Sequence, residues 1–229
     1  MPAKPIPAPR RASRPASPSP AARAAPGLHD FVYLASQSPR RAQLLAQLGV
    51  AHRPLLAAED EDAEALEAER AGESPRDYVQ RVTRHKLEAA RARLARRGLA
   101  AMPILVADTT VALGRRILGK PRDEAHAAEL LRALSGRLHH VYTAVAVWDG
   151  RRSHVALSDN RVRFAPLGDA FIDAYVASRE PFGKAGAYAI QGRMGGWIET
   201  IQGSYTGIRG VPLVETRALL EKARVRFDP

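Results

Sequence analysis

Near the start of the foldable part of the chain, the hydrophobic residues change from the period of a strand to the period of a helix. The apolar run at 31–35 predicts a short buried strand. Leucines at helical spacing predict a helix over 40–48, with Ser38 suited to the N-cap, Pro39 to the first helical position and Gly49 to the C-terminal stop. The segment therefore predicts a strand, a tight turn and a helix in direct succession.

The same two periods alternate along the rest of the chain. Further helices are expected over 75–97, 123–134, 169–177 and 212–224, and further strands over 103–107, 141–148, 160–164 and 198–201. Residues 111–118 predict a hairpin that turns at Gly114 and Arg115. Because strands and helices alternate without internal repeats, we expect an α/β fold with a mixed, twisted sheet flanked by helices.

The first 28 residues differ in composition from the rest of the chain. They are rich in proline and alanine and contain five basic residues and no acidic residue, so we expect a disordered tail over 1–28 and one folded domain over 29–229. The net charge of the chain is +11, and the tail supplies five of these charges. A small anionic substrate explains the modest remaining excess as well as a nucleic acid does, so we do not expect nucleic-acid binding to be the main function.

Composition also limits the cell compartment and the metal chemistry. The chain has no cysteine, which excludes disulfides, thiolate zinc sites and a cysteine nucleophile, and leaves carboxylates or histidine for any metal. No apolar run reaches the roughly 18 residues of a membrane span, and the N-terminus lacks the apolar stretch of a secretory signal. We therefore expect a cytoplasmic protein that does not cross a membrane.

The turn between the first strand and the first helix is a candidate phosphate site. It begins at Ser36 and ends in the adjacent arginines Arg40 and Arg41. Backbone amides at a helix N-terminus and two guanidinium groups together favour phosphate oxygens. The alternative is a capped surface helix with solvated arginines, but a position directly after a buried strand favours the phosphate site.

A lone aspartate, Asp108, is the candidate for the chemical step. It follows the run at 103–107 and is expected at the carboxyl end of a buried strand, where α/β sheets bind ligands. An aspartate there would hold a divalent ion or orient an attacking water. The alternative is a turn-forming aspartate that accepts hydrogen bonds from Thr109 or Thr110.

Three further charged features are open to two interpretations. The acidic run at 59–62 is either a solvated loop or the source of one carboxylate that binds magnesium together with Asp108. Lys120 and Lys184 each follow a glycine, and either reach an anion or lie in simple turns. For His139 a structural role is favoured over metal binding.

Five segments, in their order and spacing, resemble the Maf family. They are LASQSPRRAQLLAQLGV (34–50), VADTTV (106–111), GKPRDEAHAAELLRALSGRLHHVYTAV (119–145), EPFGKAGAYAIQG (180–192) and GSYTGIRGVPLVET (203–216). The resemblance implies a fold with two lobes and a central substrate cleft. It also implies an enzyme that cleaves nucleoside triphosphates into the monophosphate and pyrophosphate, with Mg²⁺ or Mn²⁺.

The resemblance also implies roles for single residues. It makes Asp108 the proton acceptor or water-orienting carboxylate and a metal ligand, and it matches Glu61 to the family's acidic residue near the metal, with Asp60 as a neighbour. The phosphate-binding turn of the family falls on Ser36, Arg40 and Arg41. The lysines that face the triphosphate in the family match Lys86 and Lys120.

Substrate choice is implied by a shorter segment. Residues 184–192 resemble the dTTP/UTP group of the family, and Arg41, Thr109 and Gln191 occupy the positions associated with base choice. A glutamine amide pairs with the O4 acceptor and the N3–H donor of uracil or thymine, although it can flip to suit cytosine. The family's 7-methyl-GTP group and modified pyrimidine triphosphates therefore remain alternative substrates.

The chain departs from the family's pattern at Arg209, where the family usually has an apolar residue, and this change would alter either the cleft edge or a subunit contact. The long basic N-terminal extension is also outside the pattern. Members of the family are linked to septum formation and cell division, so a regulatory protein with secondary hydrolysis is a second alternative. The resemblance further suggests a homodimer.

Overall fold

The computed structural model describes residues 27–58, 61 and 65–228, which form one mixed sheet with helices on both faces. Its strands are β1 (Val32–Leu34), β2 (His52–Pro54), β3 (Ile104–Leu113), β4 (Arg116–Leu118), β5 (Leu138–Trp148), β6 (Ser153–Phe164) and β7 (Ile198–Gln202). They lie in the order β2-β1-β3-β5-β6-β7, and β4 pairs with β3. Strands β2, β1 and β3 are parallel, while β3, β5, β6 and β7 are antiparallel. The α/β prediction with a mixed sheet is confirmed.

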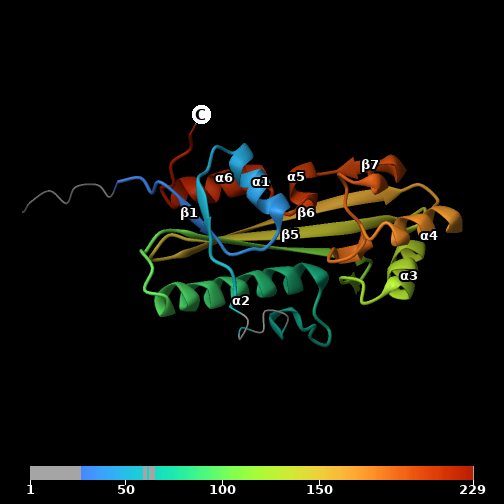
Figure 1. Cartoon of the computed structure of the whole chain (residues 1–229), viewed down its shortest axis with the longest axis horizontal. Helices are drawn as coiled ribbons and strands as arrows, with labels where there is room; N and C mark the ends of the chain where they lie inside the picture. The colour runs from blue at the N-terminus through green and yellow to red at the C-terminus, as the bar shows by residue number, and fades with distance from the viewer. Residues whose placement is uncertain (1–26, 59–60, 62–64, 229) are drawn as a thin grey trace, which may run out of the picture.

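The helices cover the sheet unevenly. They are α1 (Pro39–Gln47), α2 (Pro75–Arg96), α3 (Glu124–Leu134), α4 (Asp169–Ala177), α5 (Tyr205–Ile208) and α6 (Leu213–Lys222), with 3₁₀ turns η1 (Ala65–Glu67), η2 (Ala185–Ala187) and η3 (Arg193–Trp197). Helix α2 lies along one face, and α1 and α6 lie on the other (Figure 1). Helices α3 and α4 pack together at one end of the sheet, beside β7.

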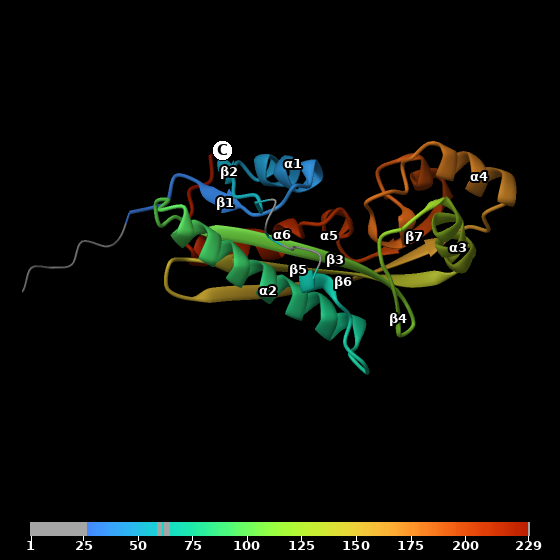
Figure 2. The same ribbon diagram turned by 60° about the horizontal axis from the view of Figure 1, so that its bottom comes forward.

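The hydrophobic core is divided between the two ends of the sheet. At one end, residues of α3 and α4 such as Leu130 and Tyr175 pack on the ends of the long strands. At the other end, Leu220 of α6 and Leu87 of α2 belong to separate clusters on opposite faces. Strands β3 and β5 contribute buried residues to both ends, so the two lobes share the same strands (Figure 2).

Strand β3 loses its neighbour on one edge for several residues. It pairs with β1 only at Ile104 and Leu105, and with β4 only from Val111 onward. Between these points, β5 is its one strand partner within the described part of the chain. The interval 106–110 therefore presents an open edge in the middle of the sheet, between the two lobes.

The position expected for Asp108, at the end of a strand, is wrong. Strand β3 continues through Asp108 to Leu113, with Asp108 opposite Ala144 of β5 and Thr110 opposite Tyr142. Threonine fits a pleated, half-buried surface well, so the polar residues extend the ladder although they interrupt the apolar run. The aspartate is consequently fixed by a regular ladder instead of a turn.

The observed bounds of other strands also differ from the predicted ones. Strands β5 and β6 both extend further toward their N-termini than predicted, because residues that form no apolar run continue the pairing, and β2 and α5 were not predicted at all. β2 has only three residues, contains a proline and is partly exposed, which gives it no periodic pattern. The expected hairpin is confirmed, with Leu113 opposite Arg116 and Gly114 at φ +61°.

The structure describes only part of the chain on which the predictions of a disordered tail and of no membrane span depend. The expected tail at 1–28 lies almost entirely outside the described residues. No helix in the described part of the chain is long and apolar enough to cross a membrane.

Candidate active site

A cavity of about 550 Å³ opens at the unpaired edge of β3. The turn from β1 to α1, the centre of β3, the middle of α2, and the loop at 183–191 supply its walls. Of the predicted site residues, those that line it are Ser36, Arg40, Arg41, Lys86, Asp108, Thr109, Lys120 and Gln191. The fold thus brings together residues that are up to 155 positions apart in the sequence (36 to 191).

The pleat of β3 sends neighbouring side chains to opposite sides of this cavity. Ile104 and Val106 pack against α2, whereas Leu105 and Ala107 belong to the cluster under α1 and α6. Since side chains alternate along a strand, Asp108 faces the α2 side, where Lys86 meets it. Thr109 faces the other side, within reach of the turn before α1.

The turn before α1 is held by hydrogen bonds to a single hydroxyl. The Ser36 Oγ accepts the backbone N–H of Ser38 at 3.2 Å and the Nη1–H of Arg41 at 3.1 Å. Arg41 also donates Nε–H to the carbonyl of Gly210 at 3.1 Å, which ties this turn to the segment after α5. Ser38 is at the N-cap, as expected, but its side chain makes no capping bond.

Burial and neighbouring positive charges destabilise the charged forms of Arg40 and Arg41. Burial lowers the pKa of Arg41, the nearby Asp108 opposes that shift and the charge of Arg40 adds to it. Burial also lowers the pKa of Arg40, and the charge of Arg209 lowers it further. Cations destabilised by burial and by each other are stabilised by an anionic ligand.

On the α2 side, two lysines and two carboxylates form a chain. Lys86 donates from Nζ to Oδ1 of Asp108 at 2.6 Å and to Oε1 of Glu67 at 2.7 Å. Lys120 donates to Oε2 of Glu67 at 3.0 Å. The hydroxyl of Tyr78 holds the main-chain oxygen of Glu67 at 2.8 Å, so η1 is fastened to α2.

Charge within this chain is balanced. Burial opposes ionisation of Glu67, but the charges and hydrogen bonds of Lys86 and Lys120 outweigh it and lower the pKa of this carboxyl. Asp108 is only 8% exposed, and its Oδ2 makes no hydrogen bond to any residue that the structure describes. That oxygen is therefore the one available to a water molecule.

Glu61 lies apart from this group. Both of its carboxylate oxygens accept from the guanidinium of Arg93, at 2.5 to 3.0 Å, and Oε1 also accepts from Arg96 at 2.5 Å. The hydrogen bonds from Arg93 lower the pKa of Glu61 to about 2. Arg93 borders the cavity and Glu61 does not. In this arrangement, Glu61 neutralises a buried arginine beside the site.

Sequence reasoning missed Glu67, a carboxylate that lines the cavity and accepts hydrogen bonds from Lys86 and Lys120. It lies in an acidic stretch that looks like a solvated loop, and only its long-range contacts with Lys86 and Lys120 reveal it. A weak signal exists in the sequence, because 65–67 is a short non-polar interruption that ends in a carboxylate shortly before the Ser74 cap.

The donor set suits a cation that shares its coordination with substrate. One lysine nitrogen contacts both Asp108 and Glu67, so their carboxylates converge on one region of the cavity. Among the described residues, no three His, Cys, Asp or Glu side chains lie close enough together to hold a metal ion without other ligands. Mg²⁺ is usually bound by one or two carboxylates plus substrate phosphates, and the pair fits that requirement.

Several uncharged side chains also line the cavity. The Thr109 hydroxyl lies 3.0 Å from that of Thr143, which donates to the carbonyl of Gly207 at 2.8 Å. Gln191 and Tyr188 also line the cavity, and the Tyr188 hydroxyl is bonded to Nε2 of His139 at 2.9 Å.

The loop that carries Gln191 is held close to β3. Gly186 has φ +68°, and a Cβ there would lie 2.8 Å from Val111. At Gly192 a Cβ would lie 1.8 Å from Oε1 of Glu180. Lys184 donates to the main-chain oxygen of Glu180, which closes the loop on itself. Glycine is required at Gly186, because its φ is positive and Val111 leaves no room, whereas a side chain at Gly192 would displace the Glu180 carboxylate.

Comparison with known proteins identifies relatives over almost all of the described chain. Residues 31–223 match the family described as Maf-like proteins. A protein of Polaromonas sp. strain JS666 is 62% identical over 198 residues, which are 86% of this chain and 98% of the relative. A protein of Cupriavidus pinatubonensis is 58% identical over 200 residues, 87% and 100% of the two chains, and one of Ralstonia nicotianae is 59% identical over 199 residues, 86% and 96%. All three relatives are named dTTP/UTP pyrophosphatase.

Proposed function

This chain belongs to the family of Maf-like proteins, and from that membership we propose that it hydrolyses dTTP and UTP to the nucleoside monophosphate and pyrophosphate. It is a nucleoside triphosphate pyrophosphatase. The observation that carries the proposal beyond family membership is the convergence of Asp108, Glu67, Lys86 and Lys120 with the arginine turn in one cavity.

In the proposed mechanism Asp108 is the catalytic carboxylate. Its Oδ1 is held by Lys86, and its Oδ2 orients a water and accepts a proton from it. As the water oxygen bonds to the α-phosphorus, the bond from that phosphorus to the bridging oxygen breaks in line with it. Pyrophosphate leaves with the bridging oxygen and the electron pair of the broken bond.

The basic residues neutralise the charge that moves during this step. Lys86 and Lys120 lie beside the carboxylates of Asp108 and Glu67. Arg40 and Arg41 lie in the first turn of α1, so the phosphate chain would bind between these two basic groups. Fixed cations aimed at developing charge are the main source of catalysis in phosphoryl transfer. Ser36 acts through Arg41, which it positions.

Asp108 and Glu67 are the residues proposed to hold a divalent cation, Mg²⁺ or Mn²⁺. The bound cation would polarise the phosphoryl oxygens and offset the charge of the leaving pyrophosphate. Displacement of Lys86 from between the two carboxylates would free that lysine to contact the phosphates. Glu61 is proposed to act through Arg93 and not as a ligand.

Base choice is proposed to lie with Thr109 and Gln191, two uncharged residues that line the cavity. The amide of Gln191 would pair with the O4 and N3–H of thymine or uracil. Arg41 donates Nε–H to Gly210 and Nη1–H to Ser36, so Nη2 is the part of its guanidinium that we propose to bind phosphate. We place the protein in the cytoplasm, where these nucleotides are found, and propose a homodimer on the resemblance alone.

The test is pyrophosphate release from dTTP, UTP, CTP, GTP, ATP and 7-methyl-GTP, with Mg²⁺ or Mn²⁺, by wild type and Asp108→Asn. Turnover confined to dTTP and UTP and lost in the variant is expected. Turnover of 7-methyl-GTP alone would keep the chemistry and refute the base assignment. A protein silent on every substrate would contradict the proposed function and favour a regulatory role.

A further inference from the structure

Arg209 directly follows α5 and contributes to the cavity wall beside the arginine turn. Its side chain is partly buried, and its Nε is fully buried without a hydrogen-bond partner among the described residues. It also forms no ion pair in that part of the chain. A buried donor without a partner is uncommon in a folded protein and needs an explanation, such as a ligand.

The charges that line the cavity are distributed unequally. Lys86 and Lys120 are paired with Asp108 and Glu67, so the charges of these four side chains cancel before a divalent cation binds. Arg93 is balanced by Glu61. The cavity-lining cations that form no ion pair with a described residue make up a second group, which consists of Arg40, Arg41, Lys184 and Arg209.

Arg40 is the centre of this second group. After burial, the charge of Arg209 is the next cause that lowers the pKa of Arg40, and the charge of Arg40 likewise lowers that of Lys184. Burial and repulsion both raise the free energy of these cations when the cavity holds only water. A polyphosphate placed among them would remove both penalties, because each guanidinium can donate two parallel hydrogen bonds to phosphate oxygens.

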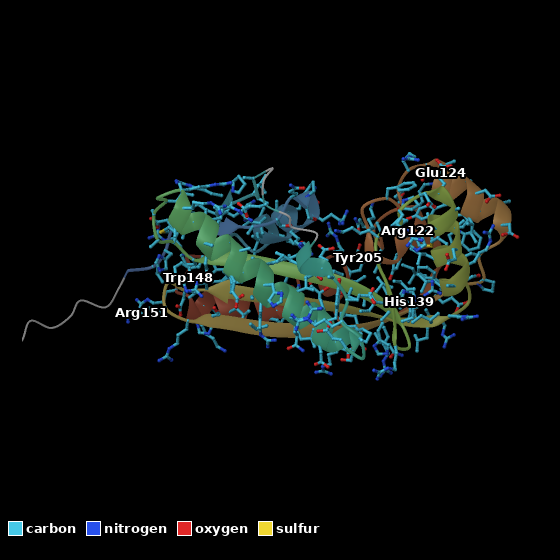
Figure 3. All side chains as sticks on the ribbon, turned by 90° about the horizontal axis from the view of Figure 1, so that it is seen from below. Arg122, Glu124, His139, Trp148, Arg151 and Tyr205 are labelled. Atoms are coloured by element: carbon cyan, nitrogen blue, oxygen red, sulfur yellow. The ribbon has the colours of Figure 1, made fainter. Side chains whose placement is uncertain are left out.

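A purely structural role for Arg209 would rest on Tyr205. The guanidinium carbon of Arg209 lies 5.9 Å from the centre of the Tyr205 ring, at the outer limit of a cation–π contact. Tyr205 is 44% exposed and lies between the lobe that carries α3 and the rest of the protein (Figure 3). Such a contact is weak, and it leaves the buried Nε without a partner.

We infer that Arg209 is a phosphate-binding residue of this site, which contacts the same anionic group of the substrate as Arg40. The inference rests on the proposed function and extends it, because it assigns a contact with the phosphates to a residue outside the arginine turn and the two lysines. The substrate class is a nucleoside triphosphate, and the group recognised is its polyphosphate rather than its base. The pyrophosphate product would also bind more tightly to the wild type than to a variant that lacks the Arg209 guanidinium, because it carries the same kind of anionic group.

The direct test is binding of inorganic triphosphate and of thymidine, measured by calorimetry on the full chain. Arg209→Met should weaken triphosphate binding roughly 10- to 100-fold, as the loss of charged hydrogen bonds does. Thymidine binding should not change. Arg217→Met is the matched control, because it removes one positive charge from the exposed face of α6, outside the cavity.

Equal triphosphate affinity of wild type and Arg209→Met would overturn the inference, and so would an equal loss of thymidine affinity. If the methionine variant does not fold, Arg209→Gln provides the same comparison. In kinetics with dTTP, the variant should raise KM and the inhibition constant of pyrophosphate by similar factors, with kcat within roughly threefold of wild type. A wild type that binds triphosphate through Arg209 but hydrolyses no nucleotide would refute the proposed function and leave this inference standing.

Discussion

Lys86 donates a 2.6 Å hydrogen bond to Asp108, and this bond joins the middle of the longest helix to the middle of an interior strand. Neither residue lies at the end of its element, and neither could shift by more than a fraction of an ångström without disturbing the packing of α2 on β3. The carboxylate that we propose to be catalytic is therefore positioned by core packing, whereas several of the groups around it come from turns and loops.

Replacement of Asp108 by asparagine should abolish most activity without loss of the fold. The amide still accepts from Lys86, but it cannot take a proton from water, so kcat should fall about 10²- to 10⁴-fold. Pyrophosphate release and thermal unfolding of the same samples provide the measurement. Asp173→Asn, on the exposed side of α4, is the control and should retain full activity. A folded Asp108→Asn enzyme with wild-type turnover would refute the assignment.

Replacement of Glu67 by glutamine should change the response to metal. If Glu67 is a ligand together with Asp108, the Mg²⁺ concentration for half-maximal activity should rise about tenfold or more. The measurement is turnover of dTTP over a range of Mg²⁺ concentrations. Glu69→Gln removes a charge two residues away, at an exposed position, and should not shift the curve. Coincident curves for wild type and Glu67→Gln would exclude the ligand role.

Glu61→Gln should lower stability, because it leaves the guanidinium of Arg93 buried without its anion. We expect a loss of about 2 kcal/mol in the free energy of unfolding at pH 7. The folded pKa of Glu61 is about 2, below its ordinary value, so its contribution is complete above pH 4.5 and is lost as the pH falls toward 2. Urea unfolding at pH 7, 4 and 3 should show the two proteins converging.

The control for that prediction is Glu129→Gln. Glu129 pairs with Arg116 on the surface, where both side chains are more than half exposed, and its loss should cause no measurable change. A pH-independent difference between wild type and Glu61→Gln would mean that the lost contribution comes from packing rather than from the carboxylate charge.

His139 should make the fold sensitive to mild acid. Burial lowers its pKa to about 4, from an ordinary value of 6.5. The unfolded chain then takes up a proton near pH 6.5 and the folded chain does not, so stability is lost as the pH falls from 6.5 to 4, by at most about 1.4 kcal/mol per pH unit. His139→Gln, which can still bond to Tyr188, should lack this slope. Parallel stability curves for the two proteins would contradict the prediction.

Gln191→Ala should weaken the choice of base more than the chemistry. Loss of the amide removes the proposed hydrogen bonds to thymine or uracil, so kcat/KM for dTTP and UTP should fall roughly tenfold while the low value for CTP stays nearly unchanged. The measurement is the ratio of kcat/KM values for UTP and CTP. An unchanged ratio would assign base choice to other groups, such as Thr109.

The sequence predicted helices better than strands. Regular helical spacing and the Ser-Pro caps placed α1 and α2 within one or two residues, because these signals are local. The length of β3 depends on β5, which comes later in the chain and pairs with Asp108 and both threonines. No local pattern shows that polar residues such as Asp108 will be buried in a ladder.

The residues of the candidate site also fall into those that local motifs predict and those that depend on long-range contacts. Its glycine-flanked lysine Lys120 and the arginine turn have recognisable motifs, and the cavity contains them. Glu61 and Glu67 could not be separated, because both lie in one acidic stretch. Which of them turns toward Lys86 and which toward Arg93 is decided by contacts with α2, 19 and 32 residues further along the chain.

The position of Asp108 within a continuous ladder has a consequence for how activity fails under stress. A backbone paired inside the sheet opens only when the whole domain unfolds, whereas turns such as η1 and the loop at 183–192 can open locally at much lower free energy. Heat or mild denaturant should therefore impair the capture of substrate first. Asp108, the proposed catalytic residue, would keep its geometry until the cooperative transition, so partly inactivated protein should recover as soon as its loops close again.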